Sequence, residues 1–442
     1  MTPAMAATDA LFAPDFKPEP YWWHSGPGKD TGPDLSLTPL PPEADVVIIG
    51  AGYTGLNAAL QTSREGLSTL VLDAESAGWG CSTRNGGQVS TSVKPSFAAL
   101  SRKHGPDIAR AILEEGQSSL DYMHALVRDE ALDCGFAEVG RFHGAHKPHL
   151  YDSLARDCAA GHPVWKTGAY MVPKAEMARE LGTAAYHGGM IFPRHCSIDV
   201  GRYHPALLAR VLAAGALVKS HCPATRLERQ GSGFAVTTPA GTIRAGKVIL
   251  ATNGYSGPLS PHHQRRIIPI GSYIIATEEL PQALVDRLFP TDRILSDTRK
   301  LVYYYRLSPD RRRVLFGGRV SLSETDPRIS AVTLHRDLVA LFPELEPYRI
   351  SYAWMGFVGY TFNTLAHCGE DKGLYHAMGY CGAGVGMASY LGMRMGRKAA
   401  GRETTPSAFE RLPFPTRPLY TGTPWFLTPS VLLYRLRDRF GV

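Results

Sequence analysis

The sequence lacks three features that mark specialised classes of protein. Its seven cysteines never form a Cys-x-x-Cys pair, so neither a disulfide framework nor a zinc site is predicted. No stretch approaches the roughly eighteen apolar residues of a membrane span, and residues 1–20 lack the basic start and apolar run of a signal peptide. We therefore expect a cytoplasmic protein with reduced thiols, no bound metal and no membrane association.

The chain also lacks a concentrated basic segment, although its net charge is +7. The densest cluster, Arg311 to Arg313, follows the turn-forming residues Ser308, Pro309 and Asp310. Such a cluster is typical of a solvated hairpin tip. No nucleic-acid partner is predicted, whereas a positive field that attracts an anionic cofactor or substrate is an alternative reading of the charge.

The chain does contain glycines placed between a strand pattern and a helix pattern. Residues 45–49 are predicted to be a strand and residues 53–64 a helix, and the loop between them supplies the spacing Gly-x-Gly-x-x-Gly. A buried strand over residues 68–72 follows and ends at an aspartate that can bind ribose hydroxyls. The helix start then faces a diphosphate. The residues expected to contact this end of a dinucleotide are Gly50, Gly52, Tyr53, Thr54, Gly55, Asp73 and Ala74.

Three further segments favour FAD over NAD. Residues 78–88 form a loop of small and amide side chains that can line an extended dinucleotide, and residues 248–254 can cover it from the other side. Residues 379–386 open a late helix whose dipole can stabilise negative charge at the pyrimidine side of a reduced flavin. A loop-bracing role is the alternative reading of Asn85. The additional residues expected to contact FAD are Gly80, Cys81, Ser82, Arg84, Asn85, Gly86, Gly87, Gln88, Ala224, Ala251, Thr252, Asn253, Gly254, Gly382, Ala383, Gly384, Val385 and Gly386.

Only one dinucleotide site is predicted, because no strand that ends in an acidic residue follows the late glycine loop at the needed distance. A flavin that exchanges electrons with NAD(P)H usually has a second nucleotide-binding domain nearby. The substrate itself is therefore expected to supply the hydride.

These motifs resemble the D-amino-acid oxidase superfamily of flavoproteins, and within it the branch that contains gamma-glutamylputrescine oxidoreductase. The match extends from the cluster Tyr21, Trp22 and Trp23, expected to dock an extended arm on the body, to residues 354–396. The resemblance implies an α/β fold with a Rossmann-like FAD-binding domain of the glutathione reductase type and a substrate domain built on an antiparallel sheet. The implied parts are an arm over 1–43, a discontinuous FAD-binding domain over 44–95, 197–266 and 352–415, a substrate domain over 96–196 and 267–351, and a C-terminal tail or helix over 416–442.

Departures from the family pattern narrow the expected substrate and cofactor linkage. Relatives that oxidise amino acids carry a carboxylate-binding arginine where this chain has Val358, which favours an amine substrate. Gly356 stands where monomeric sarcosine oxidase links its flavin to a cysteine, so the resemblance implies non-covalent FAD. Asn363, Ala366 and Ala383 replace residues that lie near the flavin in relatives, and their effect stays open.

A tyrosine-rich strand is the main candidate for the wall of the substrate pocket. Within residues 301–306, Tyr304 and Arg306 are predicted to share one face, with Tyr303 and Tyr305 on the other. An apolar slot there would keep an amine unprotonated, because desolvation lowers the pKa of an ammonium. For any single tyrosine, packing in the core is the more common role. The lining residues with expected catalytic roles are Tyr304, Arg306 and Trp354.

The resulting hypothesis is an FAD-dependent oxidase or dehydrogenase. It oxidises the C–N bond of a small amine, of polyamine type or gamma-glutamylated, by hydride transfer to flavin N5; water hydrolyses the imine, and oxygen or another acceptor takes the electrons. A secondary amino-acid oxidase of the same superfamily is one alternative, and a flavin-binding interaction protein without turnover is another. For the latter, residues 425–440 could form a docking or membrane-surface helix, although a closing helix on the FAD-binding domain is the preferred reading.

Overall fold

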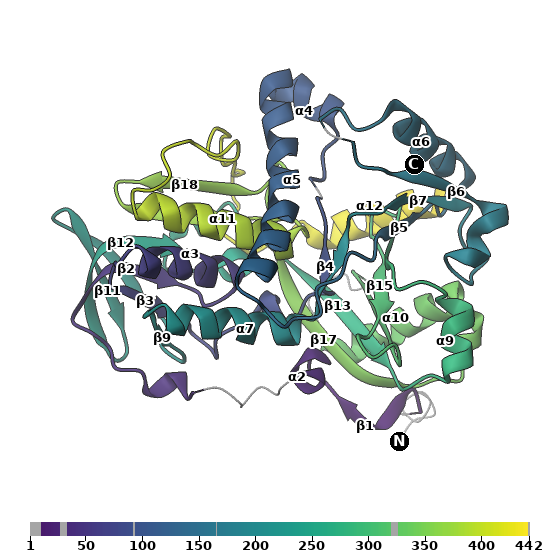
Figure 1. Ribbon diagram of the computed structural model, residues 1–442, viewed down its shortest axis with the longest axis horizontal. Helices are drawn as coiled ribbons and strands as arrows, with labels where there is room; N and C mark the ends of the chain where they lie inside the picture. The colour runs from purple at the N-terminus through teal and green to yellow at the C-terminus, as the bar shows by residue number, and fades with distance from the viewer. Residues whose placement is uncertain (1–9, 27–32, 92, 165, 320–325, 441–442) are drawn as a thin grey trace.

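The computed structural model describes residues 10–26, 33–91, 93–164, 166–319 and 326–440. Within these residues the strands form two large sheets that lie side by side, with helices packed against them (Figure 1). The predicted α/β class with parallel and antiparallel sheets is confirmed. The helices are α2 (Trp22–Ser25), α3 (Tyr53–Arg64), α4 (Phe97–His104), α5 (Pro106–Asp129), α6 (Pro148–Ala160), α7 (Val200–Ala213), α8 (Pro261–Gln264), α9 (Gln282–Leu288), α10 (Pro327–Leu341), α11 (Gly384–Ala399) and α12 (Leu427–Phe440).

The eight-stranded sheet carries the predicted strand, loop and helix unit. Its main path has the order β10-β11-β12-β2-β3-β9, and β19 pairs with both β12 and β18. β2 is parallel to β3 and to β12, as expected when helical crossovers connect buried strands. The strands are β2 (Glu43–Ile49), β3 (Thr69–Leu72), β9 (Leu217–Lys219), β10 (Arg226–Gln230), β11 (Gly233–Thr238), β12 (Gly241–Leu250), β18 (His367–Asp371) and β19 (Leu374–Met378).

β12 is longer than the sequence pattern predicts. The pattern indicates a strand over residues 247–251, whereas β12 begins at Gly241. The first half of β12 pairs with the antiparallel β11 and alternates between exposed and buried side chains. Only its last three residues, Val248 to Leu250, lie between two parallel strands and are all buried, which produces the continuous apolar run.

Helices α3 and α11 pack closely against each other beside this sheet. A Cβ at Gly392 would lie 2.3 Å from the carbonyl oxygen of Thr54, and one at Gly396 would lie 2.5 Å from that of Ala58. The contacts advance by four residues along both helices, so the two helices run in the same direction. Glycine at these positions therefore lets the backbones of the two helices touch.

The nine-stranded sheet has the order β1-β17-β13-β16-β15-β14-β5-β7-β6. The antiparallel sheet implied by the family resemblance is confirmed, because β16 pairs in the antiparallel sense with both β13 and β15. The arm adds β1 at one edge, parallel to β17, a strand that the sequence did not predict. The strands are β1 (Phe12–Lys17), β5 (Arg141–Gly144), β6 (Tyr170–Pro173), β7 (Gly188–Phe192), β13 (Ile268–Thr277), β14 (Ile294–Asp297), β15 (Tyr304–Leu307), β16 (Val314–Gly318) and β17 (Ile350–Tyr360), while β4 (Gln88–Val89) and β8 (Cys196–Ser197) pair separately.

β17 bears on the predicted division into domains. Its eleven residues all belong to the nine-stranded sheet, where β17 pairs with β13 from Ile268 to Thr277. The expected boundary at residue 352 lies inside this strand. We therefore propose that the FAD-binding part of the chain resumes after Tyr360, and that the substrate part includes all of β17.

The C-terminal helix α12 reaches beyond the FAD-binding segments, on which the sequence-based reading placed it: Phe426, just before α12, packs 6.1 Å from the ring of Phe362, while the far end of the helix contacts the connection between β14 and β15. Asp438 of α12 accepts hydrogen bonds from the amides of Lys300 and Leu301, at 2.6 and 3.0 Å, in the segment between β14 and β15. Figure 1 shows α12 running toward β5, β6 and β7. An aspartate that satisfies two amides near the end of the helix fixes this position, and such a long-range contact leaves no periodic signal in the sequence.

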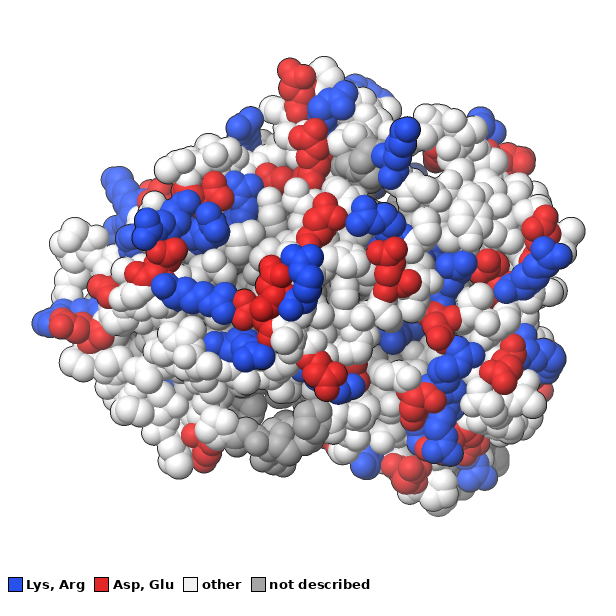
Figure 2. Space-filling view, in the orientation of Figure 1, with Lys and Arg blue, Asp and Glu red and all other residues white. Residues whose placement is uncertain are grey.

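Charges of both signs alternate over the face of the molecule shown in Figure 2, in agreement with their spread along the sequence. Among the described residues, no helix combines the length and the apolar character needed to cross a membrane.

Candidate functional site

The loop between β2 and α3 is shaped by its glycines. Gly50 has a φ of +109°, and a Cβ there would lie 2.8 Å from the carbonyl oxygen of Ala251. A Cβ at Gly55 would lie 1.9 Å from the carbonyl oxygen of Gly50. A larger residue at either position would force the loop away from its neighbours. α3 begins at Tyr53 with no side-chain cap from Gly52, the arrangement of a helix N-terminus that binds a phosphate group.

Asp73 lies directly after β3, and its carboxylate reaches back to the glycine loop. Its Oδ2 accepts a hydrogen bond of 2.7 Å from the amide of Ala51. Burial raises the pKa of the Asp73 carboxyl. The amide of Cys222 donates to the carbonyl oxygen of Asp73 at 2.8 Å, which brings the segment containing Ala224 to the same corner. Ala74 is exposed beside it. The corner therefore gathers the residues predicted for the ribose end.

The N-termini of α3 and α11 point in the same direction, and the start of α11 is offset from that of α3 along the helix axes. Gly392 of α11 is level with Thr54 of α3, and α11 begins eight residues earlier, at Gly384. α3 begins one residue before Thr54, so at about 1.5 Å per residue the start of α11 lies about 10.5 Å beyond that of α3. Thr54 also shares a hydrogen bond of 2.6 Å with the hydroxyl of Tyr380, in the turn before α11. One extended molecule can thus meet both helix N-termini, one at its phosphates and the other at its ring system.

The N-terminal arm holds the loop over residues 78–88 through two indole groups. Trp22 Nε1 donates to the carbonyl oxygen of Asn85 at 2.8 Å, and Trp23 Nε1 donates to the hydroxyl of Thr83 at 2.9 Å. Trp22 is almost fully buried. The tryptophan cluster of the arm therefore docks on the body, as expected, and it does so on the loop predicted to line the cofactor.

Arg84 and Asn85 are held within this loop. The guanidinium of Arg84 donates to the carbonyl oxygens of Trp79 at 2.7 Å and Met355 at 3.1 Å, and Asn85 Nδ2 donates to that of Cys81 at 3.1 Å. Burial lowers the pKa of Arg84. These contacts agree with a loop-bracing role, and a contact with FAD stays a prediction for both residues.

The small residues of the loop lie between α3 and β15. The hydroxyl of Ser82 accepts from the amide of Tyr53 at 3.0 Å, and a Cβ at Gly52 would lie 2.9 Å from it. A Cβ at Gly86 would lie 3.1 Å from the ring of Tyr304. Of the residues predicted in this loop only Gly87 is buried, and those that keep partial exposure are Gly80, Cys81, Ser82, Arg84, Asn85, Gly86 and Gln88.

Arg306 and Trp354 also hold this loop. Arg306 is buried, and its Nη1 donates to the carbonyl oxygens of Gly87 and Ile198, each at 2.9 Å. Burial lowers the pKa of Arg306 to about 10. Trp354 is 1% exposed, and its Nε1 donates to the carbonyl oxygen of Arg84 at 3.0 Å. Both side chains thus fix the loop to the nine-stranded sheet, and direct contact with substrate stays a prediction for each.

The turn after β12 meets the late glycine turn through Asn253. Asn253 has a φ of +39°, and its Oδ1 accepts from the amide of Gly379 at 2.9 Å. A Cβ at Gly254 would lie 3.0 Å from a backbone carbonyl of β17. Ala251 and Thr252 lead from β12 into this turn. The two segments predicted to cover the cofactor are therefore joined to each other.

Lys94 lies against the late glycine turn, and the sequence-based prediction did not include it. Its ammonium is 5.1 Å from the ring centroid of Tyr360, and it lines a small cavity with Cys381. A Cβ at Gly382 would lie 3.9 Å from its Cε, whereas a Cβ at Gly384 would meet no atom within 4 Å. The late glycine turn thus leaves free space next to the ammonium of Lys94. A positive charge at this place would stabilise the electron-rich edge of a bound ring system. The other residues predicted here are Ala383, Val385 and Gly386, and the last two are buried.

Tyr304 occupies the face of β15 that is turned toward Gly86. Its hydroxyl shares a hydrogen bond of 2.8 Å with Ser272, and its ring covers Gly317, where a Cβ would lie 2.4 Å from it. Tyr304 keeps some accessible surface although protein surrounds it, and burial raises its pKa. Tyr305 points to a separate hydrophobic core on the other face. The predicted alternation along this strand is confirmed.

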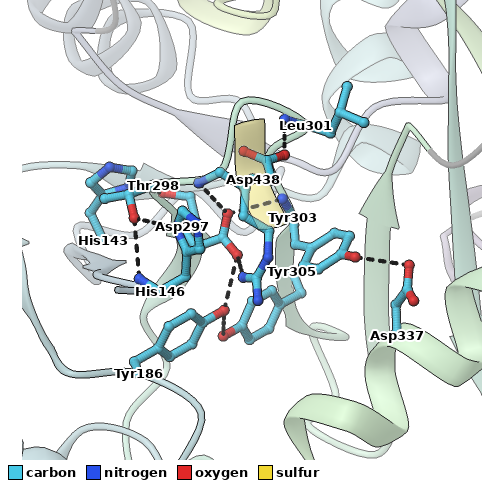
Figure 3. Close-up of polar contacts among 12 residues, drawn as sticks. His143, His146, Tyr186, Asp297, Thr298, Leu301, Tyr303, Tyr305, Asp337 and Asp438 are labelled. Atoms are coloured by element: carbon cyan, nitrogen blue, oxygen red, sulfur yellow. Dashed lines mark hydrogen bonds and ion pairs between the residues drawn. The ribbon is translucent and has the colours of Figure 1, made fainter. Parts of the chain in front are cut away.

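The opposite face of β15 carries a polar network that the sequence did not indicate (Figure 3). The fully buried Asp297 is paired with Arg299 and accepts a hydrogen bond of 3.4 Å from the hydroxyl of Tyr186. The hydroxyl of Tyr305 donates to that of Tyr186 at 3.1 Å. Burial raises the pKa of Asp297 to about 6. This network belongs to the core of the nine-stranded sheet.

Comparison with known proteins decides the family. A sequence profile described as "DAO: FAD dependent oxidoreductase" matches residues 45–397. The chain belongs to this family. Two curated relatives extend the match. A probable oxidoreductase OrdL of Rhizobium meliloti is 32% identical over 95% of this chain and 98% of its own, and the gamma-glutamylputrescine oxidoreductase of Escherichia coli is 28% identical over 90% of this chain and 93% of its own.

Solved structures of the DAO family share the fold. Glycine oxidase from Geobacillus kaustophilus superposes with a TM-score of 0.69 at 19% identity and covers 86% of this chain and 99% of its own. L-proline dehydrogenase from P. horikoshii gives a TM-score of 0.66 at 15% identity and covers 88% of this chain and 99% of its own. The protein is therefore an FAD-dependent oxidoreductase of the DAO family, as the sequence predicts.

The site of this DAO-family chain includes two aromatic residues that sequence reasoning missed. His204 of α7 donates from Nε2 to the carbonyl oxygen of Ala51 at 2.8 Å, and its ring fills the space beside Gly78. Tyr255 packs 5.9 Å from the ring of Trp79, between the loop and β17. His204 lies within α7 and Tyr255 in the turn after β12, and only the three-dimensional packing brings them to the cofactor loops.

Proposed function

We propose that this protein uses non-covalent FAD to oxidise the C–N bond of a small amine, of polyamine type or gamma-glutamylated. The observation that carries the proposal is the pair of helix N-termini, offset by about 10.5 Å, above one glycine loop. The diphosphate would lie at the start of α3, and the ring system would lie between the late glycine turn and Tyr304. The open space at Gly384 and the close glycine contacts around Gly50 fit such a molecule.

FAD, when bound, supplies a two-electron acceptor for a hydride at N5. The substrate carbon beside the nitrogen gives up that hydride, the nitrogen loses a proton, and the resulting imine is hydrolysed by water to a carbonyl compound and an amine. Tyr304 and the partly exposed side chains of β17 would exclude water from the reacting carbon. An apolar wall of this kind favours the neutral amine, because desolvation lowers the pKa of an ammonium. Oxygen or another acceptor then takes the electrons.

The hydrogen bonds that two arginines make to the backbone support an amine substrate rather than an α-amino acid. The guanidinium groups of Arg84 and Arg306 donate to backbone carbonyl oxygens at 2.7 to 3.1 Å. These contacts occupy some of the N–H donors of each guanidinium and hold it in place, so fewer donors are left to pair with a substrate carboxylate. The relative that acts on gamma-glutamylputrescine, at 28% identity, supports a long amine whose carboxylate is distant from the reacting carbon.

Arg319 gives the secondary amino-acid alternative a specific basis. It follows β16 directly, and its Nη1 donates to the carbonyl oxygen of Gly271 at 2.6 Å. Gly271 precedes Ser272, which binds the hydroxyl of Tyr304. A guanidinium on this edge of the strand could bind a carboxylate close to Tyr304.

Anaerobic mixing with a panel of substrates tests the proposal. Gamma-glutamylputrescine, putrescine, glycine and proline would each be added to purified protein while the yellow flavin absorbance is followed. We expect the amines to bleach the flavin and the amino acids to leave it oxidised. Bleaching by proline but not by the amines, and its loss in Arg319→Met, would establish the alternative; no bleaching by any compound would reject both. Acid precipitation should release all the colour if FAD is non-covalent.

A matched pair of variants at adjacent tyrosines, Tyr304 of β15 and Tyr303 just before it, tests the position of the pocket. Tyr304→Phe removes a hydroxyl on the face proposed to be near FAD, and Tyr303→Phe removes one that binds Asp337 on the other face, at 2.8 Å. We expect only Tyr304→Phe to change the rate of flavin reduction at saturating amine. Equal effects of the two variants would contradict the proposed pocket.

A further inference from the structure

Three side chains from separate segments converge outside the flavin site. His124 projects from α5, Glu138 precedes β5, and Cys196 begins β8. His124 Nε2 lies 3.6 Å from a carboxylate oxygen of Glu138 and 3.4 Å from the sulfur of Cys196. The three ligand atoms all lie within 4.8 Å of one another.

The backbone itself places two of these groups opposite each other. Ala137 and Ser197 form an antiparallel bridge, with reciprocal amide-to-carbonyl hydrogen bonds of 3.0 and 2.9 Å. The next residue on one segment and the preceding residue on the other, Glu138 and Cys196, therefore face each other as a cross-strand pair. The backbone pairing therefore brings Glu138 and Cys196 next to each other.

The third group is also held in place. The ring of His124 packs edge-on against that of Phe136, with centroids 5.0 Å apart and an interplanar angle of 84°. Cys196 is buried and belongs to β8, which pairs with β4. His124 and Glu138 keep 30% and 46% of their side-chain surface exposed, so an ion from solvent can reach the group.

The two distances from His124 Nε2, to Glu138 and to Cys196, match those of a tetrahedral metal site. Zinc binds thiolate sulfur at about 2.3 Å and imidazole nitrogen or carboxylate oxygen at about 2.0 to 2.1 Å. At a tetrahedral angle such bonds separate the ligand atoms by about 3.5 Å, close to the 3.4 and 3.6 Å observed. We propose that His124, Glu138 and Cys196 bind one Zn²⁺ ion, with water as the fourth ligand. The thiol proton of Cys196 is released to solvent when the Zn–S bond forms.

The ion would connect α5 to the cofactor loop. β8 pairs with β4, where Cys196 is opposite Val89 and Ser197 is opposite Gln88 at the end of the loop over residues 78–88. A metal bound at Cys196 would therefore stabilise β4 without contacting FAD. The cysteine spacing in the sequence gave no sign of this, because the three ligands come from three distant segments.

Metal titration of the chelator-treated full-length protein tests the proposal. We expect one Zn²⁺ per chain by calorimetry, and Co²⁺ should give the visible bands of a tetrahedral site together with a thiolate charge-transfer band. Cys196→Ser should abolish that band and weaken Zn²⁺ binding at least about a hundredfold. Cys158→Ser, which removes a partly buried thiol of α6 elsewhere, is the matched control and should change neither.

A second variant keeps the test independent of folding. Glu138→Gln alters a partly exposed carboxylate and should weaken Zn²⁺ binding by at least about tenfold while flavin content stays the same. Absence of stoichiometric binding to the native protein, or equal affinity in native protein and Glu138→Gln, would overturn the proposed site. An unchanged cobalt spectrum in a folded Cys196→Ser variant would overturn it as well.

Discussion

The two faces of β15 are built on different principles. Tyr304 faces the cofactor loops, where glycines lie against its ring: a Cβ at Gly86 would lie 3.1 Å from it. Tyr305, the next residue, faces a network of side chains that contains Tyr186 and the buried Asp297. The packing around Tyr304 thus requires glycines, which have no side chain. The packing around Tyr305 requires side chains that hydrogen-bond to one another.

This difference determines how each face responds to change. Where a Cβ added at a glycine would lie under 3 Å from a neighbouring atom, there is no room for a methyl group. Substitution of such a glycine therefore destabilises the protein through steric overlap, and its effect does not depend on pH. A buried carboxylate instead responds to protonation, because burial penalises its charged form. The following variants distinguish these two modes.

The largest effect is expected from Gly55→Ala in α3, where glycines line the proposed cofactor site. The new Cβ would lie 1.9 Å from the carbonyl oxygen of Gly50, an overlap that α3 can relieve only by moving away from β2. We expect a loss of about 4 kcal/mol or more in the free energy of unfolding, together with loss of bound FAD. Urea unfolding and the ratio of flavin to protein absorbance measure both. Gly257→Ala, with no atom within 4 Å of the new methyl, is the control; native flavin content in Gly55→Ala would contradict the assignment.

The next effect concerns Asp297 on the side-chain face. Its pKa of about 6 in the folded state lies above its ordinary value of 3.8, so the folded protein binds this proton more tightly. The resulting stabilisation, about 3 kcal/mol, is present below about pH 4 and is lost as the pH rises through 6. The native protein should therefore lose this stability relative to Asp297→Asn between pH 4 and pH 7.

Urea unfolding of both proteins across that pH range measures the effect. Asp337→Asn, which removes another carboxylate bound to a tyrosine hydroxyl, controls for the loss of such a hydrogen bond. A difference in unfolding free energy between native protein and Asp297→Asn that does not vary with pH would show that this carboxyl does not titrate near 6.

The same contrast explains what the sequence could predict. α3 runs from Tyr53 to Arg64 as expected, and the glycine loop before it was recognised because all its determinants lie within a few residues. The division of side chains between the two faces of β15 was predicted from alternation along a single strand. In each case the signal was local.

What the sequence could not predict depends on distant partners. Arg306 was placed on the correct face, but its hydrogen bonds to Gly87 and Ile198 join segments more than 100 residues away. Lys94 follows no motif, and its position beside Gly382 depends on how the late turn packs. The fold and the cofactor can thus be predicted from local sequence patterns. The residues that form the wall of the pocket cannot, because their positions depend on contacts with distant segments.

A smaller effect is expected where the arm meets the cofactor loop. Trp22→Phe removes the indole donor to the carbonyl oxygen of Asn85, which lies 2.8 Å away. A buried carbonyl that loses its partner costs about 1 to 2 kcal/mol. Trp23→Phe removes the donor to the more adaptable hydroxyl of Thr83 and should cost less. Thermal unfolding with and without added FAD measures both variants, and a larger loss in Trp23→Phe would indicate that the arm is anchored differently.

The smallest effect on stability, and the most informative for the cofactor, is expected from Gly384→Ala. This residue begins α11, and a Cβ there meets no atom within 4 Å, so the apoprotein should change by no more than about 0.5 kcal/mol. The methyl group would project where the ring system is proposed to lie, so FAD affinity should fall by about tenfold, equivalent to about 1.4 kcal/mol. Fluorescence titration of apoprotein with FAD measures the affinity. Unchanged binding would mean that the late turn faces away from the cofactor, and the offset helix N-termini would then no longer support one extended ligand.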